Sequence, residues 1–245
     1  MIKVFILAAG ASRRCGGQIK QLFLINGEPI IRRIIRQIRE VDPNIKIHII
    51  TWHNSLKYPD VGIIDTIKKP DELADSILFS VPYWGERNII LVGVAVFSDK
   101  VIKNILLYNG KFAIFGTVCC PTKNGSERFA ISFLKEESQT VINLLKKSAR
   151  IFKNSAWEGV AGLQKLCYAT HDERLIPFIC PYFYHRNEMP LHIRIVRPFR
   201  DFLEYHIMYL WIPRRIMKYI NIKDPITTDI DSIEEYNKFI ASKVV

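Results

Sequence analysis

Apolar residues recur along the chain as short β-branched runs separated by segments of helical spacing. Runs of this kind predict strands over residues 2–7, 45–51, 88–92, 112–115 and 129–133. Helical spacing predicts helices from Pro29 onward, over 71–81 and over 99–108. Strands that alternate with helices are typical of an α/β fold, with a mostly parallel central sheet and helices on both faces.

The pattern changes after residue 135. It is mainly helical over 136–166 with an interruption near Asn154, and it does not determine the structure of 167–198. Residues 198–220 are predicted to form a helix that is broken at Pro213, because proline removes a helical donor. The last helix is predicted to begin at Ser232, which forms a capping box with Glu235. With no repeat and no linker of flexible composition, the sequence predicts a single domain spanning 1–245.

Composition narrows the class of protein. Hydrophobic residues make up 49% and charged residues 24%, which excludes a disordered chain. The five cysteines include no Cys-x-x-Cys pair, so neither a disulfide framework nor a structural zinc site is indicated, and a cytoplasmic location is favoured. The apolar run at 1–9 is too short for a signal peptide, and no stretch approaches the roughly 20 apolar residues that cross a bilayer.

The charge balance favours an anionic partner. Subtracting 24 Asp and Glu from 35 Lys and Arg leaves +11. A protein with this charge attracts polyanions, and nucleic acid, an anionic membrane surface or a small phosphorylated substrate all satisfy it. The basic residues are dispersed, however, and no dense Lys/Arg tract marks a nucleic-acid arm. The arginines that alternate with isoleucines from Pro29 onward are interpreted as the solvated face of a helix.

A loop of small and basic residues follows the first predicted strand, over 7–20. Small residues let backbone N–H groups approach phosphate oxygens, while Arg14 and Lys20 can neutralise the charge that grows on a triphosphate during displacement. The loop has neither the Gly-Lys-Ser/Thr of an ATPase P-loop nor the G-x-G-x-x-G of a dinucleotide site. A basic surface turn is the alternative interpretation.

This loop resembles the signature of the nucleotidyltransferases that include sugar-phosphate nucleotidyltransferases and molybdenum cofactor guanylyltransferase. Cys15 stands in place of the usual Met and Ile19 in place of the usual Pro. Asp75-Ser76 ahead of the central strand and Thr227 to Asp231 ahead of the last helix extend the resemblance more weakly. The positions that match the signature are Gly10, Ser12, Arg14, Gly16, Lys20, Gly27 and Pro29.

The resemblance implies a Rossmann-like (GT-A type) fold and transfer of a nucleoside monophosphate from an NTP to a small phosphorylated acceptor, with Mg²⁺ and release of pyrophosphate. Arg14 and Lys20 are then the catalytic candidates, and Ser76 approaches the base or ribose. Asp231 is the implied metal ligand, although Asp229 and Asp231 also suit a turn and a helix N-terminus. The implied nucleotide-binding residues are Ala8, Ala9, Gly10, Ser12, Arg14, Gly16, Lys20 and Ser76.

One expected residue is missing. The family places a metal-binding Asp after the Gly that ends the central strand, and here Val94 follows Gly93. Three explanations compete: a degenerate homologue, replacement by Asp99, or a divergent, inactivated sequence. Asp99 also suits the cap of the next helix, so replacement ranks last. The predicted function is therefore nucleotidyl transfer, with a sugar phosphate as the expected acceptor; the alternatives are a catalytically impaired nucleotide-binding regulator and a nucleic-acid-binding protein.

Overall fold

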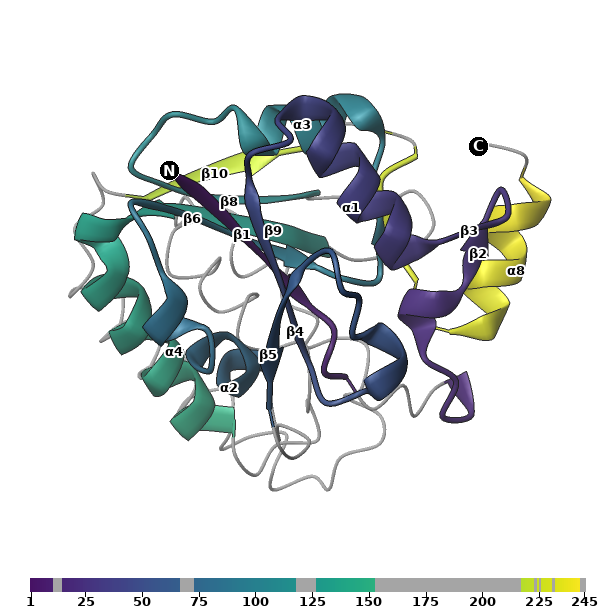
Figure 1. The fold of residues 1–245 in the computed structure, drawn as a ribbon, viewed down its shortest axis with the longest axis horizontal. Helices are drawn as coiled ribbons and strands as arrows, with labels where there is room; N and C mark the ends of the chain where they lie inside the picture. The colour runs from purple at the N-terminus through teal and green to yellow at the C-terminus, as the bar shows by residue number, and fades with distance from the viewer. Residues whose placement is uncertain are drawn as a thin grey trace, which may run out of the picture.

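A seven-stranded sheet forms the centre of the molecule (Figure 1). The computed structural model describes residues 1–10, 15–66, 73–117, 127–152, 217–222, 224, 226–230 and 232–242. The order of the strands across this sheet is β10-β8-β9-β6-β1-β4-β5. Their bounds are β1 Ile2–Leu7, β4 Lys46–Thr51, β5 Gly62–Asp65, β6 Arg87–Val92, β8 Phe112–Thr117, β9 Glu127–Leu134 and β10 Met217–Asn221.

The sheet is mostly parallel, as the sequence predicts. β1 pairs in parallel with β4 and β6, and β4 pairs in parallel with β5. β9 runs antiparallel to both β6 and β8, while β10 is parallel to β8. Within the described sheet β9 alone therefore runs against the others. The carboxyl ends of β1, β4 and β6 consequently meet at one edge, which is where open α/β sheets bind ligands.

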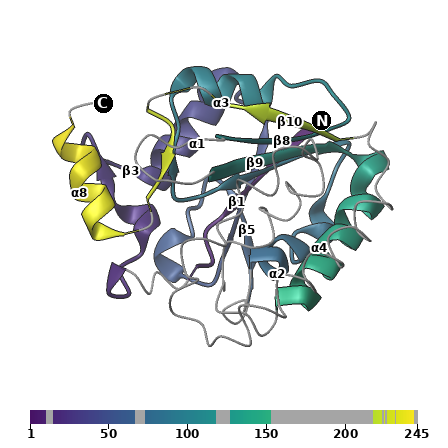
Figure 2. The same cartoon turned by 180° about the vertical axis from the view of Figure 1, so that it is seen from behind.

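Helices cover both faces of the sheet (Figures 1 and 2). α1 (Ile30–Val41) and α3 (Asp99–Leu106) lie on one face, and α2 (Leu73–Leu78) and α4 (Ser138–Phe152) lie on the other. Side chains alternate between these layers along a strand: Val4 and Ile6 of β1 pack with α1, whereas Phe5 and Leu7 pack with α2 and α4. The predicted layer arrangement is confirmed.

α1 shows how the sequence pattern determines packing. Its isoleucines are buried, which removes apolar surface from water and holds the helix on the sheet. Its arginines lie on the outer face, but they are not simply solvated. Arg36 pairs with Glu28 at 3.1 Å and with Glu40 at 2.7 Å, and Arg32 pairs with Asp60 at 3.0 Å. The buried isoleucines are Ile30, Ile31, Ile34, Ile35 and Ile38.

Smaller elements complete the edge near the chain's C-terminus. β2 (Leu24–Ile25) and β3 (Glu28–Pro29) form a hairpin, and β11 (Thr228–Asp229) pairs with β7 (Ala95–Val96). α8 (Ile233–Ala241) packs on the hairpin, where the Tyr236 hydroxyl donates to the Leu24 carbonyl at 2.9 Å. The 3-10 turns are η2 Lys20–Leu22, η3 Asn54–Leu56, η4 Val81–Tyr83 and η5 Lys135–Glu137.

Two predictions about local structure are wrong. Residues 217–220, predicted as the end of a helix, belong to strand β10, because this stretch finds a partner in β8, with Tyr219 opposite Ile114. Ser98, not Asp99, caps α3: the Ser98 hydroxyl accepts from the backbone N–H of Val101 at 3.3 Å.

The remaining predictions divide between confirmed ones and ones that lie outside the described residues. Ser232 caps α8 as predicted, accepting from the N–H of Glu235 at 3.1 Å. The predicted interruption near Asn154, the undetermined stretch 167–198 and the break at Pro213 all fall outside the described residues. None of the helices within the described part of the chain is long and apolar enough to cross a membrane.

Candidate functional site

The loop after β1 begins at the carboxyl edge of the sheet. Ala8 and Ala9 are buried and Gly10 is exposed, so the chain emerges from the core at the glycine. The N–H of Ala8 donates to the carbonyl of Ile50 at 2.9 Å, which continues the pairing of β1 with β4. Three residues of the predicted nucleotide loop therefore lie at the end of a central strand, as expected for a ligand-binding loop.

Three consecutive side chains, beginning with the last residue of β4, hold three consecutive carbonyls of this loop. The Thr51 hydroxyl donates to Ala8 at 3.2 Å. The Trp52 indole N–H donates to Ala9 at 2.9 Å, and Nε2 of His53 lies 3.2 Å from the carbonyl oxygen of Gly10. We name Thr51, Trp52 and His53 the strand-end triplet. Sequence reasoning missed it, because a motif search scores the loop and not the neighbouring strand that holds it.

The second half of the loop turns back toward α1. Gly16 and Gly17 have φ values of +60° and +80°, in the left-handed region that favours glycine. The half-buried Lys20 follows in η2. Ser12 and Arg14 lie outside the described residues, so of the predicted residues on this segment the structure describes Ala8, Ala9, Gly10, Gly16 and Lys20.

The loop after β6 lies directly against the end of β1. The N–H of Gly93 donates to the carbonyl of Leu7 at 3.0 Å. A Cβ on Gly93 would lie 2.5 Å from that oxygen, so only glycine permits this approach. The next residue, Val94, is 8% exposed and apolar. The position at which the family resemblance implies a metal-binding Asp is thus a buried hydrocarbon side chain beside the candidate site.

The carboxylate of Asp99 is hydrogen-bonded to helix α1 and not directed to a metal site. Its Oδ1 accepts from the Gln37 side-chain amide of α1 at 2.7 Å, and the same amide donates to the carbonyl of Phe97 at 3.0 Å. Among the described residues, no group of three His, Cys, Asp or Glu side chains could hold a metal ion. Val94 supplies no oxygen ligand for Mg²⁺, and Asp99 already accepts a hydrogen bond from Gln37. Asp231, the implied ligand, lies outside the described residues, and Mg²⁺ stays a prediction.

The segment that leads to the last helix is anchored beside the loop after β6. Asp224 accepts from the Ser98 hydroxyl at 2.8 Å and from the N–H groups of Ile226 and Thr227, each at 2.9 Å. Burial alone would raise the pKa of Asp224, but these hydrogen bonds outweigh burial and lower it. In β11 Asp229 lies opposite Ala95, the residue after Val94.

Ser76 occupies α2, on the face of the sheet opposite α1, and it is 5% exposed. Its proposed approach to a base or ribose is not tested by this burial alone and stays a prediction.

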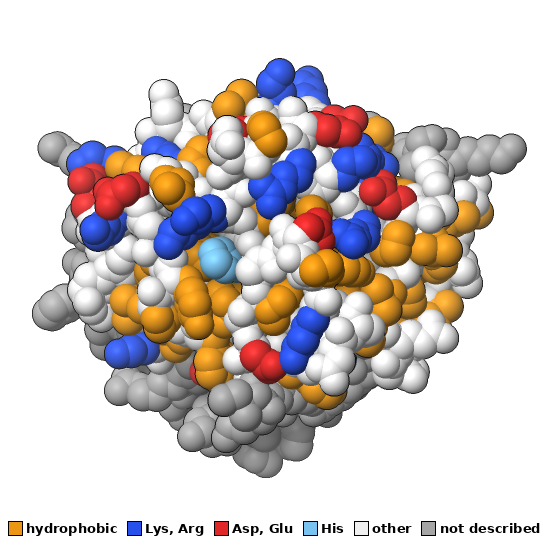
Figure 3. Space-filling model, in the orientation of Figure 1, with side chains coloured by type: hydrophobic (Ala, Val, Ile, Leu, Met, Phe, Trp, Pro, Cys, Tyr) orange, Lys and Arg blue, Asp and Glu red, His pale blue; other side chains and the backbone are white. Residues whose placement is uncertain are grey.

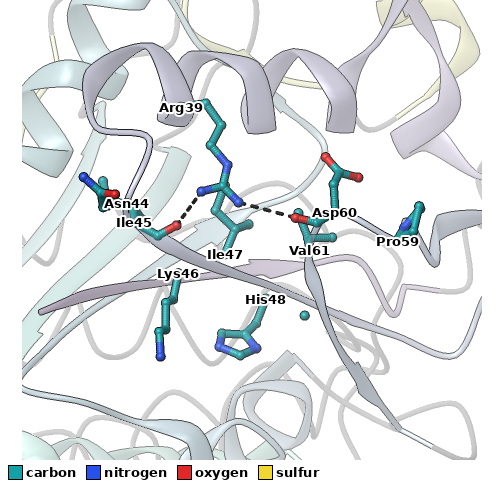
Figure 4. A pocket seen from close by; sticks show the side chains of 10 residues that line it. Arg39, Asn44, Ile45, Lys46, Ile47, His48, Pro59, Asp60 and Val61 are labelled. Carbon is teal, nitrogen blue, oxygen red and sulfur yellow. Dashed lines mark hydrogen bonds between the residues drawn. The ribbon is translucent and has the colours of Figure 1, made fainter.

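A hollow of about 340 Å³ lies at the opposite, amino-terminal edge, between the starts of β4 and β5 (Figure 4). Arg39 bridges it by donating to the carbonyls of Ile45 and Asp60, at 2.9 and 3.4 Å. The guanidinium therefore holds two loops together.

The face drawn in Figure 3 shows basic side chains interspersed with acidic and apolar ones, as the dispersed basic residues of the sequence predict.

Comparison with known proteins supports the interpretation of the loop after β1 and the α/β fold. Residues 4–78 match the family model of the MobA-like NTP transferase domain, a span that contains most of β1 together with its loop, α1, β4, β5 and α2. No curated protein matches the sequence. The resemblance to nucleotidyltransferases predicted from the N-terminal motif is thereby confirmed over that part of the chain.

Solved structures share the architecture over nearly the whole chain. A homologue of Rv0371c from Mycobacterium sp. strain JC1 matches with a TM-score of 0.54 at 12% identity, covering 98% of this chain and 96% of its own. Rv0371c of Mycobacterium tuberculosis H37Rv gives 0.53 at 10%, with 98% and 97% covered. CTP:phosphocholine cytidylyltransferase of Streptococcus pneumoniae gives 0.52 at 13%, with 98% of each chain covered. At such identities the likeness shows a common fold, which is the predicted α/β fold.

Proposed function

We propose that this nucleotidyltransferase-like chain binds an NTP at the loop after β1 and transfers its nucleoside monophosphate to a small phosphorylated acceptor. An acceptor phosphate oxygen attacks the α-phosphorus, the bond from that phosphorus to the bridging oxygen breaks, and pyrophosphate leaves. The observation that carries the proposal is the placement of the loop: it emerges at the carboxyl edge of a parallel sheet, inside the segment that matches the NTP transferase model.

The side chains of the loop supply the charge that such a transfer needs. Lys20 and Arg14 are proposed to bind the triphosphate and to stabilise the negative charge that grows during displacement. Gly10, Ser12 and Gly16 shape the loop around the phosphates, because small residues let the backbone come close. A sugar phosphate is the proposed acceptor. Phosphocholine is a second acceptor to test, since it is named for a cytidylyltransferase of the same fold.

A specific observation favours a second candidate function. Val94 is buried and apolar where the resemblance implies a metal ligand. Loss of a metal ligand removes several kcal/mol of transition-state stabilisation, about 10²- to 10³-fold in rate, but leaves the phosphate loop intact. The second candidate is therefore a nucleotide-binding regulator with little or no turnover.

Thermal stabilisation separates these functions. ATP, CTP, GTP and UTP are each added to the protein, alongside DNA and RNA, and unfolding is followed. A ligand at about 100 times its dissociation constant adds about 2.7 kcal/mol to the free energy of unfolding. Stabilisation by one NTP and not by nucleic acid supports both candidates. Pyrophosphate release with sugar phosphates or phosphocholine then distinguishes the enzyme from the regulator, and stabilisation by nucleic acid alone would contradict both.

A further inference from the structure

The strand-end triplet does more than close the end of the sheet. A peptide unit is planar and trans, so its N–H points opposite to its carbonyl. The carbonyl of Ala8 is held by Thr51 and that of Ala9 by Trp52. The N–H groups in the same two peptide units, those of Ala9 and Gly10, are therefore directed away from the triplet.

Of the two residues that carry these N–H groups, Ala9 is buried and Gly10 is exposed. Within the described part of the chain, no group accepts a hydrogen bond from the N–H of Ala9 or of Gly10. Gly10 is exposed, and the space where its Cβ would stand has no heavy atom within 4 Å. Successive N–H groups that share a direction form a concave site for an anion. Such a site exists only while the carbonyls stay on the other side.

The triplet is itself a connected unit. The Thr51 hydroxyl also accepts from the backbone N–H of His53 at 3.0 Å. One oxygen atom is therefore bonded both to the loop, at Ala8, and to the last residue of the triplet. The rings of Trp52 and His53 pack with their centroids 4.0 Å apart. Because the carbonyl of Gly10 can only accept, Nε2 of His53 carries a proton. Each donor is thus fixed by a neighbour before a ligand arrives.

We infer that Trp52 and His53 are positioning residues: Trp52 orients the peptide unit that carries the N–H of Gly10, and His53 holds the carbonyl of the same glycine, so that this N–H faces the polyphosphate of a nucleotide. Ordering a loop costs about 1–2 kcal/mol per residue, and a loop ordered in advance spares the ligand that cost. The inference rests on the proposed function and extends it to two side chains that need not touch the nucleotide.

The test compares matched variants. Trp52→Phe keeps the ring but removes the indole donor, and Trp84→Phe removes an equivalent indole bond, made at 2.8 Å to Ser80, away from the loop. His53→Ala removes the imidazole donor, whereas His53→Gln keeps an amide N–H at a similar reach. Calorimetry measures the affinity of each variant for ATP, CTP, GTP and UTP and for the corresponding nucleosides, and melting temperatures verify folding.

Trp52→Phe and His53→Ala should each weaken triphosphate binding about threefold to tenfold, as expected for one hydrogen bond. Nucleoside affinity should change less, Trp84→Phe should bind like wild type, and His53→Gln should recover most of the loss. If wild type binds a triphosphate, and Trp52→Phe and His53→Ala bind it equally well, the inference is overturned and the proposed function stands. If wild type binds no triphosphate, the proposed function itself fails.

A loss shared equally by triphosphate and nucleoside, or one that His53→Gln fails to recover, would overturn the positioning role. Either result would mean that the two side chains act on the base, the ribose or the folded state.

Discussion

Two loops at the same edge of the sheet differ in the chemistry that they present. The loop after β1 carries the backbone N–H groups of Ala9 and Gly10, whose peptide units are held through their carbonyls by Thr51 and Trp52. The loop after β6 carries the buried, apolar Val94. Gly93 joins the two loops by its hydrogen bond to Leu7, so they are neighbours and distance does not explain the difference. In the proposed function, polyphosphate binding and metal-assisted turnover therefore depend on separate parts of this edge.

Val94→Asp should change function most. A carboxylate at this position should create or raise Mg²⁺-dependent pyrophosphate release about 10²- to 10³-fold with the NTP that binds. In chelator the variant should lose about 1–3 kcal/mol of stability, because a buried carboxylate has no partner there. Pyrophosphate assays and chemical denaturation with and without Mg²⁺ measure both effects.

The wild-type chain should show little Mg²⁺ dependence in nucleotide binding. Substantial Mg²⁺-dependent turnover by the wild type, abolished by Asp99→Asn, would contradict this contrast between the loops. It would also require Asp99 to leave its hydrogen bond with Gln37.

Gly93→Ala tests the contact between the two loops. The added Cβ would lie 2.5 Å from the backbone oxygen of Leu7, which cannot move without disturbing β1. We expect a loss of about 2–3 kcal/mol in the free energy of unfolding, measured by urea denaturation. Gly10→Ala is the matched control, since its Cβ meets nothing within 4 Å and should leave stability within about 0.5 kcal/mol. Equal stability of the two variants would show that the loops separate easily.

The contrast also explains what the sequence could predict. The strands β1, β4, β6, β8 and β9 and the helices α1 to α4 follow from local periodicity, because one face of each element is buried in the sheet layers. β10 escaped prediction because a strand at the sheet edge depends on its partner, β8, whose residues lie about a hundred positions earlier. Ser98 was missed as a cap because Asp99 beside it is an equally good capping residue type.

The candidate site likewise has one part that the sequence could predict and one part that it could not. The loop after β1 is contiguous, so its residue types alone indicate phosphate binding. The strand-end triplet is brought to the loop by parallel pairing of β1 with β4, across 43 positions of sequence. No local pattern marks Trp52 or His53 as functional, since an aromatic residue after a strand is most often part of the core.

Lys20→Ala tests the loop after β1 by itself. Removing this cation should weaken triphosphate affinity about tenfold, while affinity for the nucleoside, which lacks the charge, should change little. Lys46→Ala, at the opposite end of the sheet, is the charge-matched control and should bind like wild type. Calorimetric titration of both ligands measures the difference. Equal losses for triphosphate and nucleoside would rule out a phosphate-binding role for Lys20.

The smallest effect is expected at His48, at the other end of the strand that carries the triplet. Burial lowers the pKa of His48 from its ordinary value of 6.5, and the charges of Lys3 and Lys46 lower it further. The unfolded chain therefore binds a proton more readily, so this contribution to stability is present above pH 6.5 and is lost as the pH falls through the folded pKa. His48→Phe keeps the ring that stacks on Phe5 at 5.3 Å but cannot titrate.

Between pH 7.5 and 5.5, the urea midpoint of wild type should fall more than that of His48→Phe. Triphosphate affinity should follow the same pH profile in both proteins, because His48 lies on the strand and not at the loop. Identical pH dependence of stability in the two proteins would show that His48 is as easily protonated in the fold as in the unfolded chain. A difference in triphosphate affinity between wild type and His48→Phe would show instead that the two ends of β4 are coupled. The N–H groups of the loop would then not be positioned by the strand-end triplet alone.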